Sequence, residues 1–322
     1  MPLFLFLSGM FFRNNLSIDR FIVKKFDALL KPYFVTMSVV ILIYSFKDFF
    51  PTEGALLGSL YGNGQTLWGN WAPLWYLPHL WVVFIISFLV TKYSGYNALS
   101  NALKFGSLLL LLIIGGYSLD YFFTFEWVNA NHKENITGLP FSADLLLVSV
   151  SYFLFGNLLV KEVINFRPRF FLIVIFLVGY IAIYYFTTAK IHINDRVFND
   201  PLWAILGSAF GIYLALSLSY YLAKNKWAAK ALMAAGYSSL FILIFHQLIQ
   251  SELYNFLKFY IWKKPKLIWG WIAFISGISV PILLREIVLR IKILSLLYLP
   301  IKSNSSDSER HSPKVHSQSA SQ

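Results

Sequence analysis

The stretch MPLFLFLSGMFF, residues 1–12, is almost wholly apolar and is followed directly by Arg13, Asn14 and Asn15. As a helix it would be about 18 Å long, whereas the hydrocarbon core of a bilayer is about 30 Å thick. The run therefore predicts a membrane helix that crosses little more than half of the core. Either it lies half-buried among other helices, or a further helix precedes Met1.

The composition places the whole chain in the same class as this first run. Of its 322 residues, 57% are hydrophobic, 19% are aromatic and only 13% are charged, which is not the composition of a soluble domain. The absence of cysteine excludes disulfides, cysteine nucleophiles and thiolate metal sites. The sequence thus predicts an integral membrane protein, with no metal site and no nucleic-acid partner.

Further apolar runs recur along the chain, most of them near the roughly 20 residues that a membrane span needs. They lie near residues 33–50, 73–91, 105–123, 141–160, 168–187, 201–223, 238–257 and 267–284. We therefore expect an all-α polytopic bundle of about nine segments, forming one domain over residues 1–302. Residues 288–301 predict a short helix on the membrane surface, and the polar, serine-rich residues 303–322 predict a disordered cytoplasmic tail.

The basic residues alternate between loops, which predicts the orientation of the chain. Seventeen of the 27 Lys and Arg residues fall on the side that holds residues 13–31, and eight fall on the other side. Cytoplasmic loops carry the excess of Lys and Arg, so the C-terminus is expected in the cytoplasm of a bacterial inner membrane. The basic residues between 258 and 266 run against this rule.

Six segments then follow one another in a characteristic order. They are MPLFLFLSGMFF (1–12), RFIVKKFDALLKPYF (20–34), PLWYLPHLWVVFII (73–86), LPFSADLLLVSVSYFLFGNLL (139–159), HINDRVFNDPLWAILGSAFGI (192–212) and AAGYSSLFILIFHQLI (234–249). Each is weak alone, but the ordered set resembles the acyltransferase 3 family of membrane O-acyltransferases, and in particular its fucose 4-O-acetylase-like branch.

The resemblance implies a ten-helix enzyme that moves an acetyl group from cytoplasmic acetyl-CoA to a sugar hydroxyl of a cell-surface polysaccharide or its lipid-linked precursor. The family carries its catalytic His on a first helix that has no counterpart here. Residues 1–12 resemble its second helix, with a Phe-rich approach to Ser8 and Gly9, which are candidate substrate-binding residues. The chain as it stands is therefore expected to show little or no acetyl transfer. A second departure is that Lys25 and Ala28 stand where the family often has two Arg.

Phosphate groups of acetyl-CoA require cations at the cytoplasmic mouth. The candidates are Arg20, Lys24, Lys25 and Lys31. The alternative is that these charges only contact anionic lipid headgroups.

Two histidines fall within predicted spans and are candidates for the base that takes the hydroxyl proton. An ionisable side chain inside a bilayer is a functional candidate by default, and a neutral imidazole suits proton transfer at neutral pH. His79 follows Pro78 and has the alternative of bonding a carbonyl that Pro leaves free. His246 has the alternative of joining a structural network with Gln247 and Glu252.

The acceptor sugar has candidate contacts on the outer side. Asn194, Asp195 and Arg196 offer donors and acceptors of the kind that hold sugar hydroxyls, although an exposed loop is often polar for solubility alone. Trp75 suits stacking on a sugar face, and the alternative is an interfacial tryptophan belt. Two other functions stay open from the sequence: a non-catalytic relic of the family, and a transporter of glycan precursors.

Overall fold

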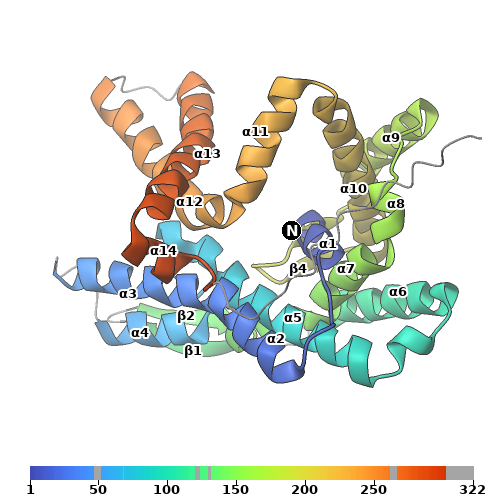
Figure 1. Ribbon diagram of the computed structural model, residues 1–322, viewed down its shortest axis with the longest axis horizontal. Helices are drawn as coiled ribbons and strands as arrows, with labels where there is room; N and C mark the ends of the chain where they lie inside the picture. The colour runs from blue at the N-terminus through green and yellow to red at the C-terminus, as the bar shows by residue number, and fades with distance from the viewer. Residues whose placement is uncertain (47–51, 68, 120–123, 130–131, 262–266, 302–322) are drawn as a thin grey trace, which may run out of the picture.

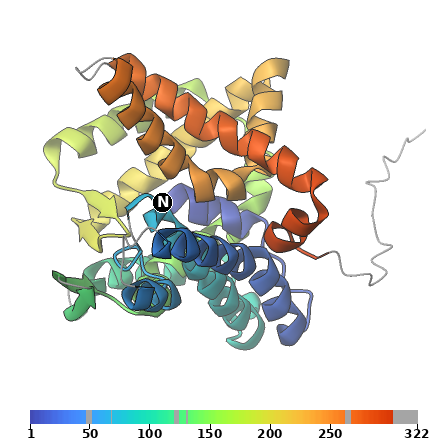
Figure 2. The same cartoon turned by 90° about the vertical axis from the view of Figure 1, so that its left-hand side faces the viewer.

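The computed structural model describes residues 1–46, 52–67, 69–119, 124–129, 132–261 and 267–301. Its helices form two groups, with the C-terminal helices α11 to α13 lying over the N-terminal helices α2 to α5 (Figures 1 and 2). The helices are α1 (Pro2–Met10), α2 (Ile18–Lys25), η1 (Phe26–Leu30), α3 (Lys31–Ser45), α4 (Thr52–Tyr61), η2 (Gly69–Trp75), α5 (Tyr76–Tyr93), η3 (Tyr96–Ala98), α6 (Asn101–Ser118), η5 (Pro140–Leu145), α7 (Leu146–Leu158), α8 (Val160–Ile164), α9 (Phe170–Phe186), α10 (Pro201–Ala223), α11 (Lys226–Tyr237), α12 (Ser239–Phe256), η6 (Leu257–Ile261), α13 (Leu267–Arg290) and α14 (Lys292–Tyr298).

The predicted all-α membrane bundle is confirmed. Within the described residues, seven helical stretches are long and apolar enough to cross a membrane, and Phe170–Phe186 is a shorter apolar helix. Every apolar run expected from the sequence corresponds to a helix, and α1 has only nine residues. Large apolar side chains cover much of the outside, as on α9, where only Ile183 is buried. Such an apolar exterior suits contact with lipid.

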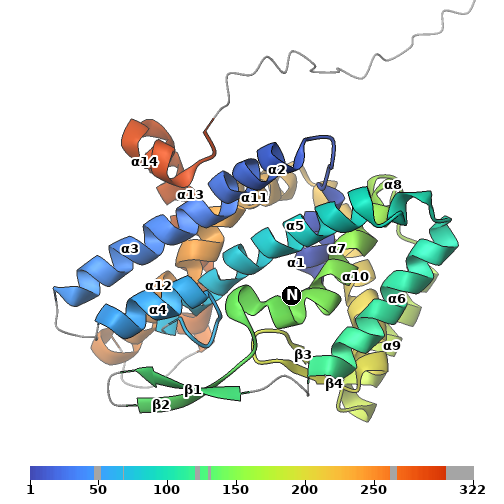
Figure 3. The ribbon, with the colours of Figure 1, turned by 90° about the horizontal axis from the view of Figure 1, so that it is seen from below.

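Two β-hairpins interrupt the helices, and the sequence reading expected only polar connectors there. Strands β1 (Thr124–Asn129) and β2 (His132–Thr137) pair antiparallel, as do β3 (Lys190–His192) and β4 (Val197–Asn199). Both hairpins lie at the same end of the bundle (Figure 3). Short strands of this kind carry too little period-two pattern to be read from sequence.

The basic residues from 18 to 31, which the charge pattern placed in a cytoplasmic loop, are helical. Helices α2, η1 and α3 run on from one another as a single stretch from Ile18 to Ser45, and η1 is a π-helical turn within it. Asp19 lies in the first turn of α2 and Lys24 and Lys25 lie in its last turn, which suits the helix dipole.

Helices α1 and α7 cross in close contact because each contributes a glycine. A Cβ added to Gly9 would lie 1.7 Å from the backbone oxygen of Phe153, and one added to Gly156 would lie 1.8 Å from that of Phe6. Small residues let membrane helices approach this closely. The contact holds the short helix α1 inside the bundle.

An aromatic cluster forms the core beside this crossing. Phe12 and Phe84 both contact Phe153, with ring centroids 5.4 and 4.9 Å apart, and Phe21 stacks on Phe88 at 4.5 Å. All five rings are buried. Helices α1, α2, α5 and α7 are therefore joined through one aromatic core.

The last described residues pack against the long N-terminal helix. Lys31 donates to the backbone oxygen of Leu299 at 2.6 Å and pairs with Asp27 at 2.6 Å, while Asp27 accepts from the backbone nitrogen of Ile301 at 2.6 Å. Residues 288–301 were expected to form a short helix on the membrane surface. The short helix found there is α14, which begins at Lys292 because α13 extends to Arg290, and it lies against α3. Residues 302–322, which include the predicted tail, lie outside the described residues.

Candidate functional site

The side chain of one buried arginine is hydrogen-bonded to three loops at the end of the bundle where the hairpins lie. Arg196 is 5% exposed. Its guanidinium donates to the carboxylate of Asp144 (Nε to Oδ2 2.9 Å, Nη2 to Oδ1 3.2 Å), to Oδ1 of Asn63 (3.0 Å), to the backbone oxygen of Asn194 (2.7 Å) and to Oγ of Ser142 (3.3 Å). We refer to these five residues as the Arg196 cluster.

These contacts use the whole hydrogen-bonding capacity of Arg196. A guanidinium has five N–H groups and accepts nothing, and the five bonds above account for all of them. Asp144 also accepts from the backbone nitrogen of Leu139 at 2.8 Å. Arg196 therefore holds protein loops together and has no donor left for a ligand.

The loop that precedes α7 is shaped to receive this ion pair. Gly138 has φ +99°, and its carbonyl accepts a hydrogen bond from the hydroxyl of Tyr61 at 2.7 Å. Burial raises the pKa of the Tyr61 hydroxyl, and the charge of Asp144 raises it further while Arg196 lowers it. Tyr61 is therefore a neutral donor at physiological pH.

Backbone strain concentrates in the same cluster. Among the described residues, four other than glycine have positive φ; Ser142 (54°) and Arg196 (57°) belong to the cluster and Phe141 (55°) precedes Ser142. Each such residue costs about 1–3 kcal/mol and persists only where the surroundings fix it. Here the buried ion pair between Asp144 and Arg196 supplies that constraint.

His79 lies next to the cluster and is fully engaged. Its Nδ1 lies 3.1 Å from the carbonyl oxygen of Phe141, which can only accept, so Nδ1 carries the proton. Its Nε2 lies 2.7 Å from Oγ of Ser149, which then donates to it. Both His79 (1% exposed) and Ser149 (0%) are buried. His79 thus helps to fix the strained loop at Phe141.

His246 is the second candidate base and lies in a different setting. Its Nδ1 lies 2.7 Å from the carbonyl oxygen of Ile242 one turn earlier, so this nitrogen also carries the proton. Its Nε2 has no hydrogen-bond partner among the described residues, and the side chain is half-buried. In its neutral form His246 therefore presents, from the middle of α12, an unprotonated Nε2 that has no hydrogen-bond partner among the described residues.

The structure brings Trp75 and Asn194 together but leaves the predicted acceptor residues in different settings, since a Cβ added to Gly64 would lie 1.7 Å from Oδ1 of Asn194 and 2.9 Å from Cδ1 of Trp75. Trp75 is buried, and its ring packs against the ring of His79 with the centroids 5.3 Å apart. Asp195 is exposed, whereas Asn194 is half-buried and its Oδ1 is buried without a hydrogen-bond partner in the described part of the chain. That oxygen lies against Gly64.

The four predicted cofactor cations are also in different settings. Arg20 and Lys24 are exposed on α2. Lys25 is half-buried, with its Nζ 3.5 Å from the centroid of the Phe84 ring. Lys31 is engaged by Asp27 and by the backbone of residue 299. Arg20 and Lys24 are therefore the two of this set that are open to a phosphate.

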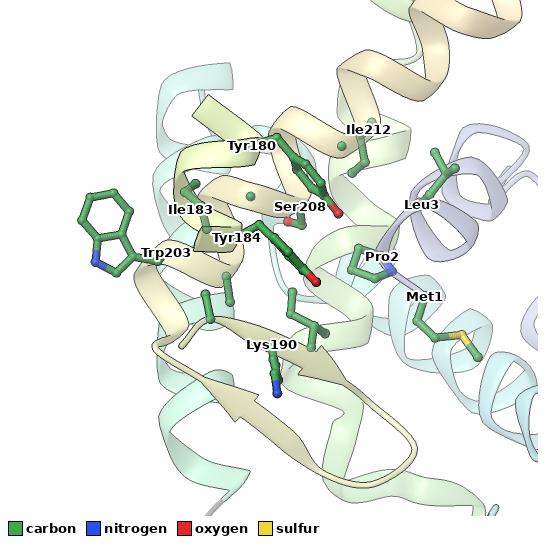
Figure 4. A pocket seen from close by; sticks show the side chains of 15 residues that line it. Met1, Pro2, Leu3, Tyr180, Ile183, Tyr184, Lys190, Trp203, Ser208 and Ile212 are labelled. Atoms are coloured by element: carbon green, nitrogen blue, oxygen red, sulfur yellow. The ribbon is translucent and has the colours of Figure 1, made fainter. Parts of the chain in front are cut away.

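Ser8 and Gly9 lie on α1, the former half-buried and the latter in the crossing with α7. A cavity of about 290 Å³ opens beside the start of the same helix, between α9, α10 and β3. The hydroxyls of Tyr180 and Tyr184 point into it (Figure 4). Within the described residues, no group of three His, Cys, Asp or Glu side chains is placed to hold a metal ion.

Sequence reasoning missed Asn63, Ser142 and Asp144 in the cluster. Asp144 carried a usable signal, because it is a lone carboxylate in the apolar stretch LPFSADLLLVSV, and a charge inside a span marks a partner or a function. Asn63 and Ser142 carried none, since their role depends on how three loops meet.

The fold and the polar cluster define a polytopic integral membrane protein with a buried, charged centre at one end of its helix bundle. The family model described as an acyltransferase domain, of the acyltransferase 3 group, matches residues 1–286, and the chain belongs to this family. Comparison with curated proteins and with solved structures finds no significant match.

Proposed function

We propose that the protein is an O-acetyltransferase of the fucose 4-O-acetylase-like branch, which moves an acetyl group from cytoplasmic acetyl-CoA to a sugar hydroxyl of a cell-surface polysaccharide or its lipid-linked precursor. It works in a bacterial inner membrane with its C-terminus in the cytoplasm. The observation that carries the proposal is the match of the acyltransferase family over residues 1–286.

The donor side of this proposal is the basic face of α2. Arg20 and Lys24 are exposed and have no carboxylate within ion-pair distance among the described residues, so they are free to meet the phosphates of acetyl-CoA. Charge-assisted bonds to phosphate are about twice as strong as neutral ones. Lys25 lies one residue further along the helix, with its charge over Phe84.

His246 is the better candidate for the base. A base must come within hydrogen-bond distance of the proton that it removes. In the neutral ring Nε2 of His246 is unprotonated and has no partner among the described residues, whereas both nitrogens of His79 are occupied and the ring is buried. His79 and Arg196 act instead on the shape of the loops that receive the acceptor, where Asn194 and Asp195 are accessible.

The acetyl transfer can be written with every bond and proton accounted for. The acceptor oxygen forms a bond to the carbonyl carbon of the acetyl group as the carbon–sulfur bond of the thioester breaks. The hydroxyl proton goes to Nε2 of His246, and CoA leaves as a thiolate that takes up this proton.

The test uses membranes from cells that carry or lack the gene and acetyl-CoA labelled in the acetyl group. The resemblance led us to expect little transfer without the catalytic His of the family, but a base at His246 would replace it. We therefore expect alkali-labile label in surface glycan only when the gene is present. His246→Gln should lower the rate by about 10²- to 10⁴-fold, the usual contribution of a positioned base, at normal protein abundance. His79→Gln should lower abundance and thermal stability while the rate per folded molecule is largely kept.

Three results would contradict the proposal. Absence of label transfer with the native gene would favour a non-catalytic member of the family. Labelling of protein, or of a lipid that carries no sugar, in place of glycan would remove the sugar acceptor. Full activity of His246→Gln would remove this residue as the base.

A further inference from the structure

An elongated apolar groove of about 590 Å³ lies between α6 and α10, with α7 as its floor. Its lining residues on α10 run from Leu202 to Leu216, which is about 21 Å along a helix axis at about 1.5 Å per residue. That length is most of the roughly 30 Å thickness of a hydrocarbon core. Since one leaflet is about half of that thickness, the groove is long enough for one whole hydrocarbon chain.

The few hydroxyls in the walls are already paired. Tyr152 and Ser208 are bonded at 2.7 Å, and Ser208 donates to the carbonyl oxygen of Ile205 at 2.7 Å. The hydroxyl of Tyr213 accepts from the backbone nitrogen of Arg169 at 3.3 Å. The rest of the lining on α6 and α10 is apolar. Between its ends the groove thus suits hydrocarbon and has no free polar group for a ligand.

One end of the groove is positively charged. Glu162 and Phe166 line this end, where α8 leads into α9. The same connection carries Lys161, Arg167 and Arg169, all of them exposed, against the single carboxylate of Glu162. Among the described residues none of these three cations has a carboxylate within ion-pair distance. The end of the groove therefore has a net charge of about +2 that nothing in the described protein neutralises.

We propose that this groove binds one hydrocarbon chain of an anionic phospholipid whose phosphate lies against Arg167 and Arg169. The apolar walls select a long chain, and the cationic end selects a negative headgroup over a zwitterionic one. Each Lys or Arg near a membrane surface contributes about 1 kcal/mol toward anionic lipid, which is roughly fivefold in affinity. The site does not depend on which group the enzyme transfers.

The other end of the groove lies beneath the Arg196 cluster. Leu202 follows Pro201, and a Cβ added to Gly116 of α6 would lie 2.8 Å from Phe198 of β4 and 3.0 Å from Pro201. Helix α6, the β3–β4 hairpin and the start of α10 are thus packed together directly beyond the groove. A chain bound between α6 and α10 supports the contact that holds the hairpin of Arg196.

The experiment measures lipid retention by native mass spectrometry and thermal stability in detergent, with added phosphatidylglycerol or phosphatidylcholine of identical chains. We expect phosphatidylglycerol to be retained more strongly and to raise the melting temperature more. Arg167→Gln with Arg169→Gln should weaken its retention by roughly 10-fold or more and abolish the preference. The matched control is Lys224→Gln with Lys226→Gln, two exposed cations of the next connection on this side.

A second pair of variants tests the groove itself. Ala209 lines the groove and is exposed, so Ala209→Trp should fill the space without disturbing the core and remove retention of both lipids. Leu218→Trp changes a 61% exposed position of the same helix outside the groove and should leave retention intact. Equal retention of the two lipids, loss of retention with Leu218→Trp, or stronger retention of a polyprenyl phosphate than of phosphatidylglycerol would overturn the proposal.

Discussion

Gly138 leaves the space that the guanidinium of Arg196 fills. A Cβ at position 138 would lie 2.4 Å from Nη2 and 2.6 Å from Nε of Arg196, and 2.7 Å from Oδ1 of Asp144. Any other residue at this position would push apart the buried ion pair, and with it the three loops that the pair joins.

Gly138→Ala is therefore expected to destabilise the protein strongly and to lower activity with it. The matched control is Gly95→Ala, because Gly95 also has positive φ (+73°) but a Cβ there would meet nothing within 4 Å. The control carries only the left-handed backbone cost of about 1–2 kcal/mol. Thermal unfolding in detergent measures the loss of stability in each of the two variants. Equal losses in the two variants would mean that the contact with Arg196 does not matter.

Removing one partner of the ion pair should cost about 3–5 kcal/mol, because it leaves the other charge buried and unpaired. We expect this of Asp144→Asn and of Arg196→Gln, and their combination should cost less than the sum of the two. Asp195→Asn, which changes an exposed carboxylate one residue from Arg196, should have little effect. Additive losses in the double variant would contradict a direct coupling.

The crossing of α1 and α7 should not tolerate a methyl group. Gly9→Ala and Gly156→Ala would each place a Cβ within 2 Å of a backbone oxygen of the other helix, so the helices must separate. We expect lower thermal stability and lower abundance in membranes. Gly106→Ala on α6 is the control, because a Cβ there meets nothing within 4 Å. An unchanged melting temperature in Gly9→Ala would show that α1 is not held by this contact.

The basic residues of α2 and α3 should have two different functions. Arg20→Gln with Lys24→Gln should raise the KM for acetyl-CoA several-fold at normal abundance, since both cations are exposed and free. Lys31→Gln should leave that KM unchanged and lower thermal stability, since Lys31 is bonded to Asp27 and to the backbone of Leu299. The reverse pattern would place the cofactor mouth at Lys31.

The orientation follows from the bias of Lys and Arg and is open to a direct test. A reporter fused after position 302 should be active on the cytoplasmic side, and one fused after a truncation within 191–200 should be active on the outer side. The opposite pair of results would invert the bundle, and the proposed cytoplasmic mouth at Arg20 and Lys24 would then face outward.

The sequence was sufficient for the class of fold because bilayer thickness imposes a length on each apolar run, and every such run is a helix. It was not sufficient for residues 18–31, where basic side chains concealed the first part of a helical stretch that continues to residue 45. The basic residues indicated a loop because hydropathy is averaged over a window of sequence. In the structure the charge of Lys25 lies over the ring of Phe84 and Lys31 pairs with Asp27, so both cations are accommodated on a helix.

For the candidate site, the sequence drew attention to Arg196, His79 and His246 as polar groups near or within apolar stretches. Their different roles depend on partners that no local pattern reveals. Arg196 is bonded to Asn63, 133 residues away, and His79 to Ser149, 70 residues away. Which side chains are free and which are occupied is decided by these distant contacts.

The bond between Asp27 and Ile301 also has a consequence during synthesis. Asp27 emerges from the ribosome 274 residues before its partner, so the long N-terminal helix is inserted while the carboxylate still lacks the backbone nitrogen that it will bind. Contacts between such distant parts of a chain form late in folding. A nascent chain that stops short of α14 would leave Asp27 without the backbone nitrogen of Ile301 and Lys31 without the backbone oxygen of Leu299. Membrane proteases that degrade incomplete proteins could recognise this unpaired end of the bundle.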